Sequence, residues 1–408
     1  MAAAVLGNTL EVFDFIAYGT YAVPIGRAFF PNHDPFVSLL LSVTAFGLGF
    51  VTRPLGALLI GAYADRSGNR AAMLVSLSLM GLGSLIIAGL PPTHVIGLAA
   101  PLLLVAARLI QGIAWGGEAG PATIYLLDTA GPGREGRLVS WQAISQAGAV
   151  LLAGLAGVLL AQWLGGAALS AWGWRLPFAF GVAVVPIGLW LRAGPSPDQA
   201  PARGPDPAPR GSLTRVLGCG FVLMVGGTVT TYFLNFSTSY ALTVLHLPIG
   251  NALLVGVAIG ACAMLAAYGG GVLCDRAGSR AIVVWPRLLI GLLIVPGLWL
   301  ASRNDSSVVF ILLCTVVAAL QAAAFVGSLV LIIRALPAGL RTMRFGMLYA
   351  VSIALFGGTA QIAFVALIRD TGSAIAPGWY IAAVNLLAAG AALALPRGSD
   401  AKQTNRGD

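Results

Sequence analysis

Charged residues are scarce in this chain. Only 9% of its 408 residues are Asp, Glu, Lys or Arg, whereas 58% are hydrophobic and the mean hydropathy is +0.90. This composition excludes a soluble globular domain. The hydrophobic runs reach about 20 residues or more and contain Gly and Pro, which favours membrane helices over the short alternating strands of a barrel. We therefore predict an all-α integral membrane protein.

Histidine and cysteine are also rare, and their placement argues against an enzyme. The three histidines, His33, His94 and His246, fall in predicted loops, and the four cysteines show no metal-ligand spacing. We therefore expect no metal, no cofactor and no nucleophile–base pair. A sizeable extra soluble domain, which a membrane sensor would carry, is not visible. A cleavable secretory signal is not evident either, because the first hydrophobic run contains Glu11 and Asp14.

A short charged phrase occurs twice in the chain. Residues 61–70 (GAYADRSGNR) return as residues 271–280 (GVLCDRAGSR), and the matched Gly, Asp and Arg positions all lie 210 residues apart (271 − 61). Duplicated halves in a membrane protein indicate a transporter.

We predict twelve membrane helices, six on each side of a proline-rich break. The first six lie near 8–30, 36–63, 72–90, 95–127, 138–163 and 174–192, and the second six near 213–243, 250–273, 281–301, 307–335, 344–368 and 377–395. The predicted domains are a bundle over 1–193, a solvated linker over 194–211, a second bundle over 212–396 and a tail over 397–408.

The net charge of +9 is explained by topology rather than by a nucleic-acid partner. If both ends of the chain are cytoplasmic, sixteen of the 23 Lys and Arg residues lie in inner loops and the tail, and four lie in outer loops (Arg27, Arg175, Arg303 and Arg369). The positive-inside rule then places both charged phrases on the cytoplasmic side.

The few charges inside the predicted helices are candidates for function, because a charge at the bilayer centre costs from about 2.5 kcal/mol upward unless it is paired or hydrated. The acids are Glu11 and Asp14 in the first helix and Glu118 in the fourth, and the bases are Arg53, Arg108 and Arg287. The acids and Arg108 are candidates for proton coupling, since a carboxylate whose pairing changes between inward- and outward-facing states can bind and release a proton. A static ion pair between Arg108 and a first-helix acid is the alternative.

Arg108 also suits a substrate carboxylate, because its planar fork binds bidentately and keeps its charge. Competition between substrate and Asp14 for Arg108 would couple the two fluxes. At about 100° per residue, Asp14 and Tyr18 share one side of the first helix, and Arg108, Gln111 and Glu118 share one side of the fourth. Beside this polar stripe, Gly112, Gly116 and Gly120 would let a neighbouring backbone approach closely.

Further polar residues are candidates for substrate binding, although Ser, Thr and amide side chains often only join membrane helices. The candidates are Tyr18, Arg53, Gln142, Gln146, Tyr232, Asn235, Gln321 and Gln361. Arg53 is either a second substrate cation or the partner of a buried acid. We expect Arg287, near one end of its helix, to extend to the cytoplasmic interface.

The repeated loops resemble the signature loop of the major facilitator superfamily, and residues 108–112 (RLIQG) resemble its fourth-helix motif. Residues 7–15 (GNTLEVFDF), 29–31 (FFP), 116–118 (GGE) and 173–178 (GWRLPF) resemble the metabolite:proton symporter family. Residues 140–146 (SWQAISQ), the Thr-rich seventh helix and residues 376–379 (APGW) are most similar to its citrate–proton symporter and tricarballylate branch.

This resemblance implies two bundles that rock around a central site in a bacterial inner (plasma) membrane, import an organic acid with protons and function as a monomer. Asp14 and Arg108 match by position the acid and Arg implicated in proton coupling in related symporters. The resemblance assigns gating on the cytoplasmic side to Asp65, Arg66, Arg70 and Asp128, and to Asp275, Arg276 and Arg280 in the second copy.

Two departures from the family pattern concern gating. Residues 333–337 (IRALP) replace a Thr-Glu pair found in many relatives, so the second-half clamp must differ, and residues 68–70 (GNR) lack the usual extra base. A Gly-Pro antiporter motif is absent from residues 148–157, which favours symport.

We predict import of citrate or a related tricarboxylate. Import of an anion against an inside-negative potential costs about 2.3 kcal/mol per charge per 100 mV, and co-transported protons remove that penalty. The alternatives are proton-coupled uptake of another metabolite, such as a dicarboxylate, α-ketoglutarate, shikimate, proline or betaine, and, from a different class, a non-transporting membrane sensor.

Overall fold

The computed structural model describes residues 2–67, 69–116, 127, 130, 133–182, 212–303, 306–336 and 341–396. Nearly all of these residues are helical, and none of them forms a strand. Eight helices in the described ranges are long and apolar enough to cross a membrane, and two shorter apolar helices, Leu74–Gly89 and Ala99–Trp115, accompany them. The predicted all-α membrane fold is confirmed.

Residues 2–182, here called the first half, contain the following elements. They are α1 (Ala2–Thr20), α2 (Ala22–Phe29), α3 (Pro35–Val51), α4 (Arg53–Ser67), α5 (Asn69–Gly89), α6 (Thr93–Ile96), α7 (Ala99–Trp115), α9 (Glu135–Ala171) and η1 (Gly173–Arg175), followed by helical residues 176–182.

Residues 212–396, here called the second half, contain six helices. They are α11 (Leu213–Thr243), α12 (Ile249–Ala277), α13 (Ser279–Arg303), α14 (Ser307–Ala335), α15 (Arg341–Thr371) and α16 (Ala376–Ala394). Each corresponds to one predicted span, and the predictions for 213–243 and 307–335 agree at both ends.

Proline divides two of the predicted spans in the first half. Pro24 has no N–H to donate to the carbonyl of Thr20, and the helix is interrupted at Tyr21 between α1 and α2. Pro54 likewise cannot donate to Phe50, and α3 ends at Val51 before α4 begins at Arg53. The second break places Arg53 at an irregular point in the middle of its span.

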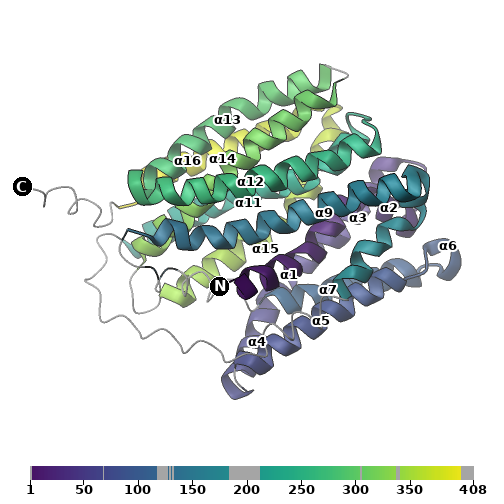
Figure 1. Ribbon diagram of the computed structural model, residues 1–408, viewed down its shortest axis with the longest axis horizontal. Helices are drawn as coiled ribbons and strands as arrows, with labels where there is room; N and C mark the ends of the chain where they lie inside the picture. Colours follow the sequence, from purple (N-terminus) through teal and green to yellow (C-terminus); the bar gives the residue numbers. More distant parts are fainter. Residues whose placement is uncertain are drawn as a thin grey trace, which may run out of the picture.

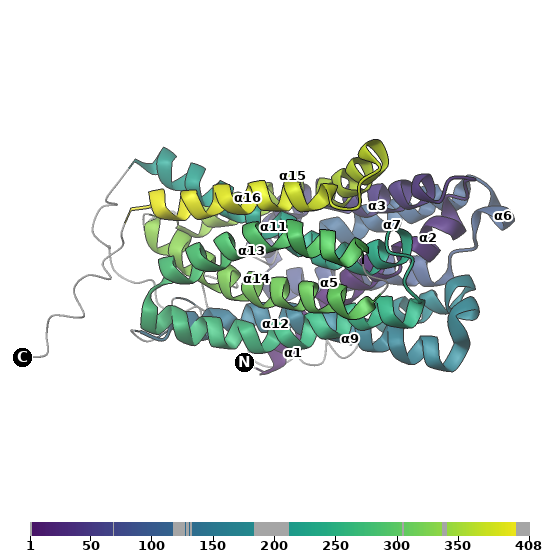
Figure 2. The ribbon, with the colours of Figure 1, turned by 90° about the horizontal axis from the view of Figure 1, so that it is seen from above.

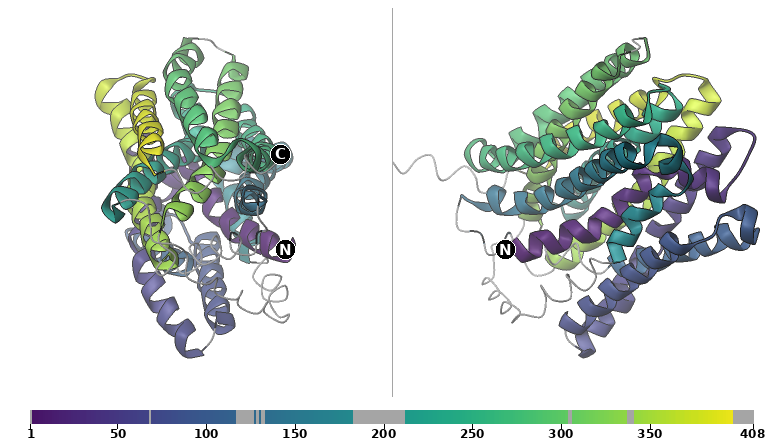
Figure 3. Two further views of the ribbon diagram at one scale, coloured as in Figure 1. Left: turned by 90° about the vertical axis from the view of Figure 1, so that its left-hand side faces the viewer. Right: turned by 45° about the vertical axis from the view of Figure 1, so that its right-hand side comes forward.

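Two helix pairs form the most extensive contacts between the described halves. Figure 1 shows α9 running alongside α12, and Figure 2 shows the same pair side by side from above. The second pair is α3 with α15, and Figure 3 shows α4 and α5 on the opposite side of the molecule from α13. The candidate site therefore lies where α1, α3, α4 and α7 meet α11 and α15.

Glycine allows these pairs to touch through their backbones. A Cβ atom on Gly47 would lie 2.6 Å from the carbonyl oxygen of Gly358, and one on Gly271 would lie 2.6 Å from that of Gly136. Gly47 and Gly358 join α3 to α15, whereas Gly136 and Gly271 join α9 to α12. Direct backbone contact at these positions leaves no room for a side chain and holds the halves close together.

Glycine plays the same part inside the first half, as the stripe on the fourth predicted helix indicated. A Cβ atom on Gly112 of α7 would overlap Gly49 and Thr52, and one on Gly116 would overlap the carbonyl of Arg53. Thr52 Oγ1 also donates a hydrogen bond to the Leu109 carbonyl (2.9 Å). These contacts fix α7 against α3 and α4; Gly120 lies outside the described residues.

Gly112→Ala is expected to destabilise the protein by about 1–3 kcal/mol, because the new methyl group overlaps backbone atoms that cannot move independently. The matched control is Gly390→Ala in α16, where a Cβ atom has no neighbour within 4 Å. That change is expected to be neutral or to stabilise by about 0.5–1 kcal/mol, because Ala loses less backbone entropy than Gly in a helix. Thermal unfolding midpoints of the purified variants in detergent measure the difference. Equal midpoints would contradict the packing described.

Candidate functional site

Asp14 of α1 lies in the interior of the first half, with 2% of its surface exposed. Its Oδ2 accepts a hydrogen bond from Nε2 of Gln111 on α7 (2.5 Å), and the same nitrogen donates to Ser84 Oγ on α5 (3.1 Å). Asp14 Oδ1 faces Gly181 and has no hydrogen-bond partner among the described residues. One carboxylate oxygen is therefore fixed, and the other is able to take up a proton.

Arg108 of α7 is fully buried among aromatic rings. Its guanidinium carbon lies 3.8 Å from the centre of the Tyr18 ring and about 6 Å from three phenylalanine rings, of which Phe15 is 5.8 Å away. Nε, Nη1 and Nη2 all lack a hydrogen-bond partner in the described part of the chain, and no ion pair with Asp14 is formed. Arg108 and Asp14 are therefore not in hydrogen-bond contact in this state, and the face of the Tyr18 ring stabilises the Arg108 charge.

Arg53 lies in a second aromatic cage, at the break between α3 and α4. Its guanidinium carbon is 3.8 Å from the Trp115 ring, 4.1 Å from Phe50 and 5.0 Å from Phe15. One side of the guanidinium faces the Tyr232 hydroxyl of α11. Nε and Nη2, which form one edge of the guanidinium group, have no partner among the described residues.

Phe15 of α1 connects the two cages. Its ring is 5.0 Å from the guanidinium carbon of Arg53 and 5.8 Å from that of Arg108. Among the described acids none forms an ion pair with Arg53, so its role as a second cation of the site stays a prediction. Both cations lie near one aromatic ring and have N–H groups without a partner among the described residues, and N–H edges of this kind bind oxyanions bidentately.

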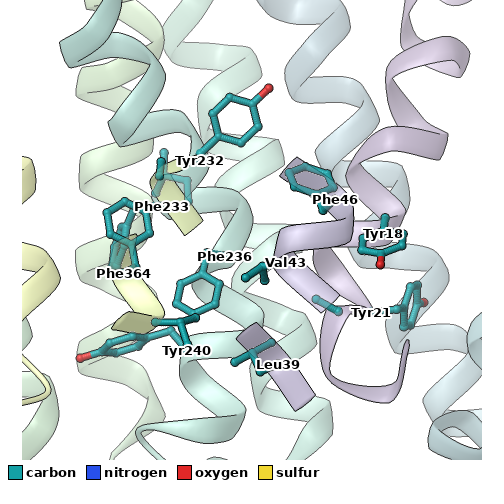
Figure 4. Close-up of a cluster of buried hydrophobic side chains, with 14 of the residues drawn as sticks. Tyr18, Tyr21, Leu39, Val43, Phe46, Tyr232, Phe233, Phe236, Tyr240 and Phe364 are labelled. Atoms are coloured by element: carbon teal, nitrogen blue, oxygen red, sulfur yellow. The ribbon is translucent and has the colours of Figure 1, made fainter. Parts of the chain in front are cut away.

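Residues of the second half face these cages. Figure 4 shows Val43 and Phe46 of α3 opposite Phe236 and Tyr232 of α11. The Tyr232 ring packs edge-on against Phe50, with 5.1 Å between the ring centres. Asn235 lies one turn further along α11, with its carbonyl against Gly19 of α1.

Two glutamines of the predicted set lie at the same boundary. Gln361 of α15 is 1% exposed, and its Nε2 donates to the Tyr232 carbonyl at 3.5 Å. Gln146 of α9 is hydrogen-bonded to the hydroxyl of Tyr349 on α15, a tyrosine that also faces Arg53. Gln142 is buried one turn earlier on α9.

The expectation that Arg287 extends to the membrane interface was wrong. Arg287 is fully buried, and its Nη1 donates to Oε1 of Gln321 (2.6 Å) and to Oδ1 of Asn385 (3.0 Å). Gln321 is thus bonded to Arg287 inside the second half. Because Arg287 lies near one end of its predicted helix, the sequence suggested that its side chain reaches the membrane interface. The amide side chains of Gln321 on α14 and Asn385 on α16 instead bind it inside the bundle.

Sequence reasoning also missed Ser84, Phe15 and Asn385. Ser84 and Asn385 resemble ordinary helix-joining polar residues, and nothing in the sequence distinguishes Phe15 from other phenylalanines. The 210-residue offset between Gln111 and Gln321 (321 − 111) was the one signal that pointed to the Arg287 cluster. Several predicted positions lie outside the described residues: Glu118, Asp128, and the side chains of Glu11, Asp65 and Arg70.

A model of the Major Facilitator Superfamily matches residues 11–360. The chain belongs to this superfamily. It is 36% identical over 386 residues to a citrate-proton symporter of Salmonella typhi, covering 92% of this chain and 88% of the relative. An alpha-ketoglutarate permease of Escherichia coli is 33% identical, covering 94% and 90%. The crystal structure of a D-xylose-proton symporter superposes with a TM-score of 0.77 at 17% identity, covering 95% of each chain, which shows the shared fold.

In this major facilitator chain the second copy of the repeated phrase connects the two halves. Asp275 of α12 accepts hydrogen bonds from the backbone N–H groups of Gly136 (2.6 Å) and Arg137 (3.2 Å) at the start of α9. The Arg137 side chain also lies 3.6 Å from Asp275. A carboxylate at a helix N-terminus meets unpaired N–H groups and the positive end of the helix dipole.

A second ion pair lies beside this contact. Arg334 at the end of α14 pairs with Glu135 at the start of α9, with Nη2 and Oε2 2.5 Å apart. Arg334 belongs to the residues 333–337 that depart from the family pattern. Of the other predicted gating residues, Arg280 donates to the Leu395 carbonyl, and Arg66 and Arg276 are exposed.

The opposite end of the bundle has a weaker contact between the halves. Arg369 at the end of α15 lies 3.8 Å from Asp34, the N-cap of α3, and both side chains are nearly half exposed. Ser239 of α11 donates to the Gly19 carbonyl at 3.4 Å. The described halves are therefore joined at both ends, and the Arg53 and Arg108 cages lie between the two sets of contacts.

Proposed function

We propose that this membrane protein imports an organic acid, citrate or a related tricarboxylate, together with protons. The observation that carries the proposal is the pair of caged guanidinium groups, Arg53 and Arg108, which have unpartnered N–H groups and both lie near Phe15. The similarity to citrate-proton symporters and to an alpha-ketoglutarate permease supports the same class of substrate. Transport, rather than catalysis, is the activity of these relatives by name.

Two cations suit a substrate with several carboxylates better than a zwitterion such as proline or betaine. A guanidinium edge binds one carboxylate through two parallel N–H···O bonds, which sets the orientation as well as the affinity. Arg53 and Arg108 then bind two carboxylates. Tyr232, Asn235, Gln361, Gln142 and Gln146 supply hydroxyl and amide groups for the remaining oxygens, and Tyr18 supports Arg108.

The proton binds at Asp14 in this mechanism. Arg108 and Gln111 lie one turn apart on α7. The helix that holds Asp14 through Gln111 therefore also carries Arg108, which binds the anionic substrate. Ionised Asp14 attracts Arg108, and protonation of Asp14 removes that attraction. Arg108 then binds a substrate carboxylate more strongly, because no ionised Asp14 competes for its charge. This competition links proton uptake to substrate binding. The acids Glu11 and Glu118 remain further candidates for this role.

Gating is proposed at the end of the bundle that holds Asp275. In the orientation that the positive-inside rule predicts, this end and both termini face the cytoplasm. Release of the Asp275 and Glu135–Arg334 contacts opens the path to the cytoplasm while the Asp34–Arg369 end stays closed. Bundles over 1–193 and 212–396, connected by the linker 194–211 and ending in the tail 397–408, are the rocking units of a monomer.

The purified protein is expected to be stabilised against heat by citrate or tricarballylate more than by succinate, α-ketoglutarate or proline. A dicarboxylate can bind Arg53 and Arg108, but only a tricarboxylate has a third carboxylate for the hydroxyl and amide groups around them. A thermal-shift screen measures this order, and uptake into proteoliposomes with an imposed proton gradient tests transport. Stabilisation by proline alone, with no effect of any carboxylate, would overturn the proposal. Binding without gradient-driven uptake would favour a membrane sensor.

Asp14→Asn is expected to abolish proton-driven accumulation and to keep substrate exchange, because the amide cannot ionise but still bonds to Gln111. Accumulation and counterflow of labelled substrate in proteoliposomes separate the two activities. The control Asp370→Asn removes an exposed acid near the end of α15 and is expected to keep accumulation. Gradient-driven uptake at the unmodified rate in Asp14→Asn would remove Asp14 from the mechanism.

Arg108→Lys and Arg53→Lys are each expected to lower the uptake efficiency, kcat/KM, by about tenfold or more, because an ammonium ion keeps the charge but loses the bidentate edge. Arg27→Lys, at an exposed position near the end of α2, is the matched control and is expected to leave uptake unchanged. Initial rates over a range of substrate concentrations give the comparison. Full activity in both lysine variants would show that the cations act without direct binding.

A further inference from the structure

A third guanidinium, Arg287 of α13, is buried in the second half without a compensating charge. Its side chain is fully enclosed, and it contacts neutral groups on α11, α14 and α16. Nη1 is occupied by the oxygens of Gln321 and Asn385, whereas Nε and Nη2 have no partner in the described residues. No acidic side chain in the described ranges pairs with it.

The groups around Arg287 are themselves fixed by neutral partners. Gln321 Nε2 donates to the Gly227 carbonyl and to Thr231 Oγ1, both at 3.0 Å. Asn385 Nδ2 donates to Thr230 Oγ1 and to the Ile381 carbonyl, both at 2.8 Å. These bonds orient both amide oxygens toward the guanidinium but contribute no negative charge.

The first half has the opposite arrangement at the equivalent position. Gln111 and Gln321 are repeat partners, 210 residues apart (321 − 111). Gln111 donates to the carboxylate of Asp14, whereas Gln321 accepts from the cation Arg287. Each half therefore holds one buried charge through the equivalent glutamine, and the charge in the second half is positive.

An unpaired charge in a dry interior is costly to bury, and the cluster could be packed with a neutral side chain. The same low dielectric carries its field further than in water. The cluster adjoins the boundary between the halves, because Thr231, which bonds to Gln321, lies four residues before Asn235 and on the same face of α11. The Asn235 carbonyl lies against Gly19 of α1.

We propose that Arg287 is a specificity-determining residue. Its fixed positive charge, inside the second half, selects substrates by their number of negative charges without contacting them. This inference rests on the proposed binding of an organic anion between the halves. Because the energy of an ion in a fixed potential is proportional to its charge, loss of Arg287 weakens binding more for each added carboxylate.

The test compares three variants of the full chain. Arg287→Met removes the charge at similar volume. Asn385→Asp keeps the guanidinium and neutralises it, because the new carboxylate replaces an amide whose oxygen is already 3.0 Å from Nη1. Arg287→Lys keeps the charge and is the control.

The affinities of the purified proteins for butyrate, glutarate and tricarballylate are measured by thermal-shift titration, and each variant is compared with the unmodified protein for the same ligand. The ratio of the two dissociation constants, variant to unmodified protein, cancels differences in ligand shape. Arg287→Met and Asn385→Asp are expected to weaken binding about threefold, tenfold and thirtyfold as the ligand charge rises from one to three. Arg287→Lys is expected to show no such dependence on ligand charge.

Equal losses for all three ligands in both neutralised variants would show a purely structural role and overturn the inference. If Arg287→Met does not fold, Asn385→Asp decides the outcome, since it preserves the shape of the cluster. A different result, in which the unmodified protein binds none of the carboxylates, would refute the proposed function itself.

Discussion

The stabilisation of buried guanidinium groups without acidic partners is the constraint on which the rest of this protein depends. A charge inside a membrane protein is tolerated when it is paired, hydrated or surrounded by suitable dipoles. The faces of Tyr18 and Trp115 provide that stabilisation for Arg108 and Arg53, and amide oxygens provide it for Arg287. Because aromatic faces and neutral amides leave N–H edges free, the cations remain able to attract an anion.

The helix packing supports this arrangement. Direct backbone contact at Gly112 and Gly116 holds α7 against α3 and α4, so Arg108 and Trp115 are carried to the same region as Arg53. Pro54 interrupts the second span beside Arg53, which places this cation at a point where the helix is irregular. The contacts of Asp275 with α9 and of Gly47 with Gly358 then bring the second half over the two cages.

The two halves share an architecture but differ in charge. Their repeated loops and their equivalent glutamines descend from one pattern, yet Gln111 holds an acid and Gln321 holds a base. The glutamine of the first half therefore holds the acid proposed to bind the proton, whereas the glutamine of the second half holds a fixed cation. A proton-coupled transporter of anions needs both: one group that changes its charge during the cycle, and others that keep theirs.

The sequence by itself determined the membrane class, the helices and the repeat, because hydrophobic length and periodicity are local properties. It also identified Asp14, Arg53 and Arg108, since a charge within a hydrophobic run is conspicuous whatever surrounds it. It did not reveal that Gln111, rather than Arg108, bonds to Asp14, or that Arg287 points inward. Those outcomes depend on which side chains from distant helices meet, and only tertiary packing decides whether a buried charge finds an acid, an amide or an aromatic face.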